Sequence, residues 1–158
     1  MAKRTSGDVA AQRQRLAAGL IDYGASFTEL GRRFADTLGV HSTDAFALME
    51  IAAAEAADAP LSPALLGKRI TLTSGAMTTL LNRLEQAGYV TRSREHTDRR
   101  VVTLRCSARA RQLADEFFRP VNTTQDAILG EYAPEQLAQF EALLRRLRAA
   151  MDDPPAQR

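Results

Sequence analysis

Seven arginines lie in the twenty residues from Arg92 to Arg111, where only Glu95 and Asp98 carry negative charge. Within this stretch, the triplet Asp98-Arg99-Arg100 falls between two short apolar segments at residues 89–90 and 101–104. Strand, charged loop and strand in this order indicate a β-hairpin with a cationic tip. A guanidinium can contact phosphate or enter a narrow, A·T-rich minor groove. We therefore interpret the tip, with Arg94 beside the triplet, as a DNA-binding element; the alternative is a solvated turn that contributes little energy.

A helical pattern from Thr73 to Ala87, closed by Gly88, comes directly before this hairpin. Its apolar residues recur at helical spacing and predict a buried stripe of Met77, Leu80, Leu81 and Leu84. The other side carries small or polar residues that can approach base edges and phosphates, namely Ser74, Gly75, Thr78, Thr79 and Asn82. An ordinary exposed face is the alternative for these five. Arg83 is open between a phosphate contact and a structural pair with Glu85 or Asp98.

Two helix starts of the same kind suggest how this helix is positioned. Ser62 is the expected N-cap of one helix, with Pro63 in its first position, and Thr73 is the expected N-cap of the next. The break between them, at about residues 69–72, is the length of a turn. Two helices joined by a tight turn form a helix-turn-helix, which favours DNA binding for the second helix. Lys68 and Arg69 near the turn are candidates for additional phosphate contacts.

Long amphipathic helices are expected at both ends of the chain. In the first, apolar residues recur at steps of four and three and Gly39 follows: Leu16, Leu20, Tyr23, Phe27, Leu30, Phe34 and Leu38. In the last, which is expected to start at Pro134, the corresponding residues are Leu137, Phe140, Leu144, Leu147 and Met151. Such stripes require partner helices, so two copies of the chain are expected to interlock as a homodimer, through Leu16, Leu20 and the last helix. The dimer would place two recognition helices about 34 Å apart, one turn of DNA.

Two further helices complete the expected architecture. Ser42 or Thr43 is expected to cap a helix through Phe46, and Ser107 to cap one that Pro120 kinks or splits. The fold class is mainly α with a small β-hairpin wing: a winged helix-turn-helix flanked by long dimerisation helices. We expect dimerisation regions at residues 9–38 and 107–151, a DNA-binding domain at 42–106, and disordered tails at 1–8 and 152–158.

Composition narrows the class of protein. The chain has 158 residues, of which 45% are hydrophobic, as suits one compact domain or one subunit of an oligomer. Its single cysteine cannot form an intrachain disulfide, which fits a reducing compartment, and no signal peptide or membrane span is recognisable, so a cytoplasmic location is expected. No glycine-rich phosphate loop, metal-ligand cluster or nucleophile triad is visible. We expect no enzymatic activity, no cofactor and no metal.

The stretch from Leu61 to Leu113 resembles the MarR family of transcription regulators. That family has a helix ending in Leu-Glu-x-x-Gly-hydrophobic-Val-x-Arg, followed by a wing bearing Asp-x-Arg. Here these motifs read Leu84-Glu85-Gln86-Ala87-Gly88-Tyr89-Val90-Thr91-Arg92 and Asp98-Arg99-Arg100. The motifs cover the central third of the chain, while the flanking helices match by architecture alone. After the wing the family commonly has Leu-Thr-x-x-Gly, where this chain has Cys106-Ser107-Ala108-Arg109-Ala110.

The resemblance implies a homodimer that binds a pseudo-palindromic operator on double-stranded DNA, acts as a repressor and responds to a small-molecule effector. It also implies that Arg100 enters the minor groove while Asp98 pairs with it or with a neighbouring arginine; Arg99 is left between phosphate and solvent. A winged-helix module that binds proteins and not DNA is one alternative. A redox-responsive regulator acting through Cys106 is another, although this position suits a buried, inert thiol.

The effector site has only weak candidates in the sequence. Tyr23, Phe27, His41 and Phe46 are placed by position near the junction between the dimerisation helices and the DNA-binding module. The two histidines, His41 and His96, are too few and too far apart for a metal-sensing site. The effector itself, the operator and the regulated genes are not identified by the sequence.

Overall fold

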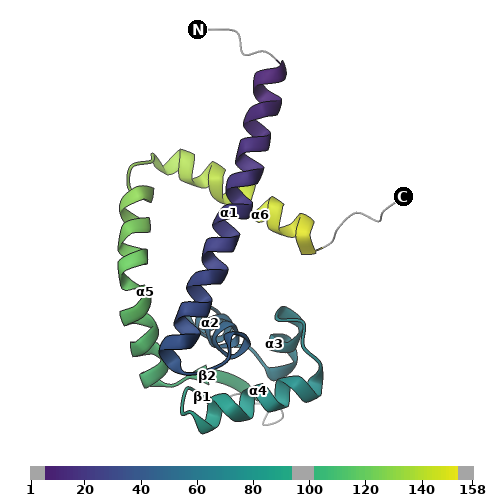
Figure 1. The fold of residues 1–158 in the computed structure, drawn as a ribbon, viewed down its shortest axis with the longest axis vertical. Coiled ribbons are helices and arrows are strands. Elements are labelled where there is room, and N and C mark those ends of the chain that lie inside the picture. Colours follow the sequence, from purple (N-terminus) through teal and green to yellow (C-terminus); the bar gives the residue numbers. More distant parts are fainter. Residues whose placement is uncertain (1–5, 94–101, 153–158) are drawn as a thin grey trace, which may run out of the picture. The chain divides into compact units, whose positions relative to one another are not determined.

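The computed structural model describes residues 6–93 and 102–152, and these residues form a mainly helical chain with one antiparallel hairpin (Figure 1). In chain order the elements are α1 (Ser6–Leu38), α2 (Ser42–Ala56), α3 (Pro63–Arg69), α4 (Ser74–Gln86), β1 (Val90–Ser93), β2 (Thr103–Cys106), α5 (Ala108–Leu129) and α6 (Pro134–Asp152). The expected fold class is confirmed. The chain divides into two compact units, one up to Asp115 and one from Glu116.

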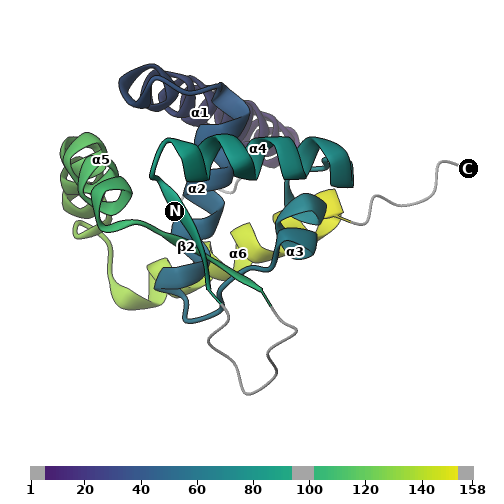
Figure 2. The ribbon, with the colours of Figure 1, turned by 90° about the horizontal axis from the view of Figure 1, so that it is seen from below.

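The core of the first unit gathers side chains from five elements. Its largest fully buried apolar side chains are Phe34 of α1, Leu48 and Ile51 of α2, Leu66 of α3, Leu80, Leu81 and Leu84 of α4, and Leu104 of β2. Each such side chain stabilises the fold by about 1.5–3 kcal/mol relative to an exposed one. The predicted inner stripe of α4 is therefore confirmed, and α4 lies beside α3 with the hairpin leading away from its end (Figure 2).

The apolar stripe of α1 is used in two different ways. Phe34 and Leu38, near its end, are buried in the first unit, whereas Tyr23 and Phe27 are 60% and 46% exposed. The final turns of α1 thus belong to the core around α2 and α4, and the earlier turns leave their apolar side chains uncovered. The helix also begins at Ser6, three residues before the expected start, so residues 6–8 are helical.

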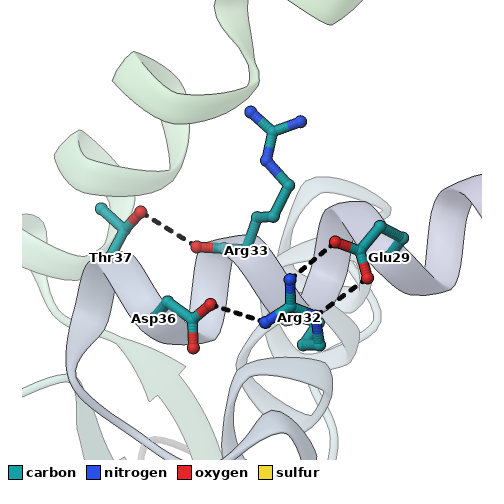
Figure 3. Close-up of polar contacts among 5 residues, drawn as sticks. All are labelled: Glu29, Arg32, Arg33, Asp36 and Thr37. Carbon is teal, nitrogen blue, oxygen red and sulfur yellow. Dashed lines mark hydrogen bonds and ion pairs between the residues drawn. The ribbon is translucent and has the colours of Figure 1, made fainter.

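The exposed side of α1 carries a short chain of ion pairs (Figure 3). Arg32 donates hydrogen bonds to Glu29 at 2.7 and 2.9 Å and to Asp36 at 2.9 Å. The hydrogen bond from Arg32 lowers the pKa of Glu29, and the hydrogen bond to Glu29 raises the pKa of Arg32. Arg33 points away from this group (Figure 3). Because all these side chains are exposed, the pairs contribute little to stability.

Local signals set most of the helix ends. Ser62, Thr73 and Ser107 accept hydrogen bonds from backbone N–H groups three residues ahead, as predicted. Gly39 and Gly88 have φ of 68° and 72°, and each helix closes with the bond of a Schellman end: Val40 N–H to Ala35 O and Tyr89 N–H to Leu84 O. The left-handed ends expected at both glycines are confirmed.

One local expectation was wrong, and one of two alternatives is excluded at a second place. The helix expected to be capped by Ser42 or Thr43 begins at Ser42, and His41 occupies its N-cap with no side-chain bond. The reason is that the carbonyl of His41 already accepts the first helical N–H groups, from Asp44 and Ala45. Pro120 was expected to kink or split its helix, and the split is excluded because α5 runs from Ala108 to Leu129 with Pro120 inside it.

The hairpin is held to the helices at its base. β1 and β2 pair with Val90 opposite Cys106 and Ser93 opposite Thr103. The N–H of Leu104 also donates to Leu61 O at 2.8 Å, which ties β2 to the segment before α3. In the second unit, the apolar side chains of α6 that were predicted to face a partner are exposed, including Phe140, Leu144, Leu147 and Met151.

One glycine brings α1 and α2 close together. A Cβ at Gly31 would lie 2.7 Å from two ring carbons of Phe46, whereas one at Gly24 would meet nothing within 4 Å. Both glycines are inside α1. Alanine gains about 1 kcal/mol over glycine inside a helix, but forcing a methyl group into a filled core costs about 1–3 kcal/mol.

We therefore expect Gly31→Ala to lower the free energy of unfolding by about 1–2 kcal/mol, and Gly24→Ala, as the matched control, to leave it equal or slightly higher. Urea unfolding followed by far-ultraviolet circular dichroism, at one protein concentration, measures both. Equal stabilities for the two variants would mean that the ring of Phe46 moves aside without cost.

Candidate nucleic-acid interface

The outer face of α4 is polar, exposed and backed by the core. The five residues predicted to meet DNA are all exposed: Ser74, Gly75, Thr78, Thr79 and Asn82. The start of α4 is capped by Thr73, whose Oγ1 accepts a hydrogen bond from Ala76 N–H at 3.3 Å. Its C-terminus is capped by the Schellman motif at Gly88. A helix held at both ends and buried along one side presents the other side as a rigid surface.

The turn before α4 includes a strained residue that the sequence analysis did not single out. Thr71 has φ of 54°, the left-handed region that non-glycine residues adopt at a cost of about 1–2 kcal/mol. The N–H of Leu72 donates to Gly67 O at 3.0 Å and closes the turn. Arg69, a candidate phosphate contact, is paired with Glu50 of α2 at 3.0 Å, while Lys68 is exposed.

The two threonines of the face use their hydroxyl protons within the helix. Thr78 Oγ1 donates to Ser74 O at 3.0 Å, and Thr79 Oγ1 donates to Gly75 O at 3.2 Å. A hydroxyl has one proton, so each oxygen that faces outward keeps only its acceptor lone pairs.

Arg92 joins α4 to the base of the wing. From β1, its Nη2 donates to Asn82 Oδ1 at 3.1 Å and pairs with Glu85 Oε2 at 3.0 Å. The sequence motif contained Arg92 and Glu85, but their spacing along the chain gave no sign that they bridge a helix and a strand. The structure therefore adds Arg92 to the candidate interface, where it orients Asn82.

Arg83 has a structural partner that the sequence analysis did not propose. Its guanidinium makes two hydrogen bonds to Asp44 of α2, at 2.6 and 2.9 Å, and the hydrogen bond to Asp44 raises the pKa of Arg83. Asp44 is 1% exposed. Of the alternatives that the sequence left open for Arg83, the pair with Glu85 is not found, since Glu85 pairs with Arg92. Arg83 thus holds α4 to α2. Arg83 and Asp44 are too far apart in the sequence for their spacing to indicate this pair.

The tip of the wing lies outside the described residues. Arg94, Asp98, Arg99 and Arg100 are all in this part, so their expected contacts with DNA stay predictions. The described base of the wing is ordered by the hairpin pairing and by Thr103, whose Oγ1 donates to Ser93 O at 3.3 Å.

Glu55 at the end of α2 organises the far side of the wing base. It accepts a hydrogen bond from Cys106 N–H at 2.9 Å and lies 3.7 Å from both Arg105 and Arg111. Arg111 in turn donates to Cys106 O at 2.6 Å. The sequence analysis missed Glu55 altogether, because its partners are about fifty residues away.

Cys106 is buried beside this network. Burial, followed by the charge of Glu55, raises the pKa of its thiol to about 12. The sulfur lies 3.7 Å from Leu48 O. A thiol in this setting is protonated at neutral pH, so the geometry favours an inert core residue over a redox switch.

A hollow of about 790 Å³ borders the helix-turn-helix. Its lining includes Lys68 of α3, Leu72 in the turn, Met77 and Thr78 of α4, and Arg92 of β1. The hollow is therefore continuous with the polar face of α4 at Thr78 and with Arg92, and it adds concave surface to the candidate interface.

The predicted effector residues divide into two places. Phe46 packs on Gly31, and Tyr23 and Phe27 precede Gly31 by two turns and one turn on the same side of α1. His41 instead lines a separate hollow of about 350 Å³ with Gly39, Val40, Asp44, Arg83 and Ala87. Tyr23 and Phe27 thus lie on α1 before the point where Phe46 of α2 meets Gly31, and His41 lies beside the Asp44–Arg83 pair.

Most of the predicted dimer residues are open to solvent. Leu16, Phe140, Leu144, Leu147 and Met151 are exposed, and Leu20 and Leu137 are partly so. Among residues 6–93 and 102–152, no group of three His, Cys, Asp or Glu side chains could hold a metal ion. Over the same residues, no helix has the length and apolar character that crossing a membrane requires.

Comparison with known proteins shows which family and which relatives this chain resembles. The MarR family model matches residues 43–102. The HTH-type transcriptional regulator YcgE of Bacillus subtilis is 35% identical over 78 residues, which make up 49% of this chain and 51% of that protein. The chain spans about half the length of the curated relatives it matches.

Two solved structures share the fold. NadR in complex with 4-hydroxyphenylacetate has a TM-score of 0.59 at 22% identity, over 93% of this chain and 95% of its own. The MepR-DNA complex of S. aureus has a TM-score of 0.53 at 14% identity, over 82% of this chain and 94% of its own.

The family model covers α2, the helix-turn-helix and the wing, the stretch in which the motifs around Leu84 and Asp98 lie. The fold found in the solved structures agrees with it. Residues 43–102 therefore match the MarR family model, and about half of the chain is similar to HTH-type transcriptional regulators.

Proposed function

We propose that this chain is a DNA-binding transcription regulator that acts on a pseudo-palindromic operator as a homodimer, and that it is a repressor released by a small-molecule effector. The observation that carries the proposal is the outer face of α4, which is polar, uncharged and exposed between a buried stripe and the arginine-braced base of the wing. A face of this kind can enter the major groove without desolvating a charge. That the structurally similar MepR binds DNA supports the same role here.

Homodimer formation would cover the uncovered apolar side chains of the terminal helices. On α1 these are Leu16, which is exposed, and Leu20, which is partly exposed; on α6 they are Phe140, Leu144 and Met151, all exposed in the single chain. Exposed apolar side chains in rows on two helices favour association, because burial removes their surface from water. A dimer would present two copies of α4 to successive major grooves.

Effector release follows from a change in the spacing of the two recognition helices. A ligand that binds one spacing better than the other shifts the population toward that spacing. Tyr23 and Phe27 of α1 and Phe46 of α2, which packs on α1 at Gly31, are the proposed contacts for an apolar effector, and His41 is a candidate in its separate hollow. NadR, of similar fold, is known in complex with 4-hydroxyphenylacetate, which supports a small-molecule effector.

A winged-helix module that binds protein partners is the competing class. The two classes differ in how affinity responds to salt, because binding to DNA releases counterions from the phosphates. Operator affinity of the full chain, measured at several salt concentrations on DNA from upstream of its own gene, separates the two.

We expect that affinity to fall steeply as salt rises, with a slope of about −0.9 per phosphate contact in a plot of log affinity against log salt concentration. Arg100→Ala should weaken operator binding about tenfold while the dimer, measured by light scattering, stays intact. Unchanged operator affinity in Arg100→Ala would remove the wing from the mechanism, and weak, salt-independent binding by the unaltered chain would favour a protein partner.

Arg83 offers a second test, because the structure gives it a role in positioning. Arg83→Ala leaves the buried carboxylate of Asp44 without this guanidinium, so we expect the free energy of unfolding to fall; the exposure of the arginine end keeps the loss below that of a fully buried pair. The salt slope of operator binding should stay the same. A slope reduced by about 1 would show that Arg83 contacts a phosphate after all.

Cys106 provides the test of the redox alternative. Because the pKa of the folded thiol is about 12 against an ordinary 9.0, alkylation by iodoacetamide at pH 8 should be slower in the folded chain than in urea, by a factor on the order of a hundred to a thousand. The alkylation rate of the folded chain should rise as pH increases from 9 toward 12, because the thiol ionises in this range. Over the same range the free energy of unfolding should fall, because the unfolded chain releases the thiol proton at lower pH than the folded chain. Hydrogen peroxide should leave operator affinity unchanged; a loss that Cys106→Ala prevents would revive the redox alternative.

A further inference from the structure

On the exposed face of α4, hydrogen bonds within the chain determine which side-chain groups remain as donors and which remain as acceptors. Along one line of the helix lie Ser74, Thr78 and Asn82, four residues apart, with Gly75 and Thr79 on the neighbouring line. Three of these side chains, those of Thr78, Thr79 and Asn82, are each already engaged in one hydrogen bond within the chain. The groups left for DNA follow from those bonds.

The threonines are left as acceptors. Both hydroxyl protons are donated to carbonyl oxygens of the preceding turn, to Ser74 O from Thr78 and to Gly75 O from Thr79. Each hydroxyl oxygen therefore meets an incoming group with lone pairs, and each γ-methyl group offers an apolar contact. Such an oxygen can accept from an exocyclic amino group, which adenine and cytosine present in the major groove.

Asn82 is left as a donor. The guanidinium of Arg92 can only donate, so the atom of Asn82 that lies 3.1 Å from its Nη2 is the amide oxygen. Glu85 holds the same guanidinium nitrogen at 3.0 Å. With the oxygen turned toward Arg92, the amide NH₂ is the end left for the groove. Asn82 then gives up the two-bond contact with adenine, which needs both ends of the amide, and can donate to the acceptor edge of guanine or thymine.

We propose that α4 selects its operator half-site through this fixed polarity: Thr78 and Thr79 accept from the amino group of an adenine or cytosine, and Asn82, held by Arg92, donates to the acceptor edge of a guanine or thymine. This inference rests on the proposed DNA-binding function. Arg92 acts as a positioning residue, since it works through Asn82.

The test pairs side-chain changes with the deletion of single groups on the bases. A preferred site is first selected with the full chain from random double-stranded oligonucleotides. Each base of that site is then replaced by an analogue that lacks one group. For the acceptors, 7-deazaguanine lacks N7 of guanine, 2-aminopurine lacks O6 of guanine, and 5-methyl-2-pyrimidinone lacks O4 of thymine. For the donors, purine lacks the amino group of adenine, and 2-pyrimidinone lacks that of cytosine. Affinities are measured for the unaltered chain, Asn82→Ala, Thr78→Val and Arg92→Met. Far-ultraviolet circular dichroism checks that each variant folds.

We expect the loss of an acceptor at one base to weaken the unaltered chain about tenfold and to leave Asn82→Ala unaffected. The loss of an amino group at another base should likewise weaken the unaltered chain and not Thr78→Val. In Arg92→Met, the released amide oxygen should make Asn82 sensitive to the loss of an amino group as well. This last result is one that a purely structural role of Arg92 would not produce.

Thr124→Val is the matched control, because Thr124 is also exposed and also donates to a carbonyl oxygen of the preceding turn, that of Pro120, but lies on α5. It should show the same response to every analogue as the unaltered chain. Thr78→Ser, which keeps the acceptor and loses the methyl group, should keep the response to loss of the amino group.

Two results would overturn the proposal. One is that Asn82→Ala abolishes the effect of removing a base amino group; the other is that Thr78→Val abolishes the effect of removing a base acceptor. A preferred site at which neither variant couples to any analogue would overturn it too, while leaving the proposed function standing. If the unaltered chain selects no sequence and binds no DNA, the proposed function fails and this inference fails with it.

Discussion

The orientation of α4 depends on the ion pair between Asp44 and Arg83. Asp44 is almost completely removed from water, and an isolated carboxylate in such a place is strongly unfavourable. Two short hydrogen bonds from Arg83 offset that cost only while α2 and α4 keep their present separation and rotation. A pair of this kind adds little net stability compared with apolar packing, but it penalises every arrangement that separates the two charges. The leucines of α4 can bury themselves in several ways, whereas the ion pair admits few.

Two further contacts extend this constraint from α4 to the hairpin. Arg92 connects β1 with Asn82 and Glu85 of α4, and Glu55 connects α2 with β2 and the start of α5. Taken singly, partly exposed pairs of this kind are weak. Their effect here comes from their placement, since together with the Asp44–Arg83 pair they connect α4 to the base of the wing, the base of the wing to α2, and α2 back to α4. The polar face of α4 is consequently presented in one position relative to the strand from which the wing extends.

The sequence predicted those features that depend on neighbours along the chain. The buried stripe of α4, the caps at Ser62 and Thr73, and the left-handed ends at Gly39 and Gly88 each follow from residues within about one turn. Partners far apart in sequence were not accessible to such reasoning. Arg83 could be seen to need a partner, but nothing in the spacing identified Asp44, thirty-nine residues away. Thr71 shows the same limit in another form, because the turn imposes a backbone conformation that threonine itself disfavours.

The helix α1 gives the proposed regulation a physical route. Its last turns lie in the core with Phe34 and Leu38, and the hydroxyl of Tyr89, just past α4, donates to Leu38 O at 3.0 Å. Its earlier turns carry the exposed residues through which the proposed dimer would form. One continuous helix of 33 residues therefore joins the dimer contact to the recognition module. At Gly31 the ring of Phe46 leaves no room for an added methyl group, so α1 has little freedom to slide along α2. A ligand that tilts α1 beside Phe27 would on this account have to move α2, and with α2 the Asp44–Arg83 pair that sets the position of α4.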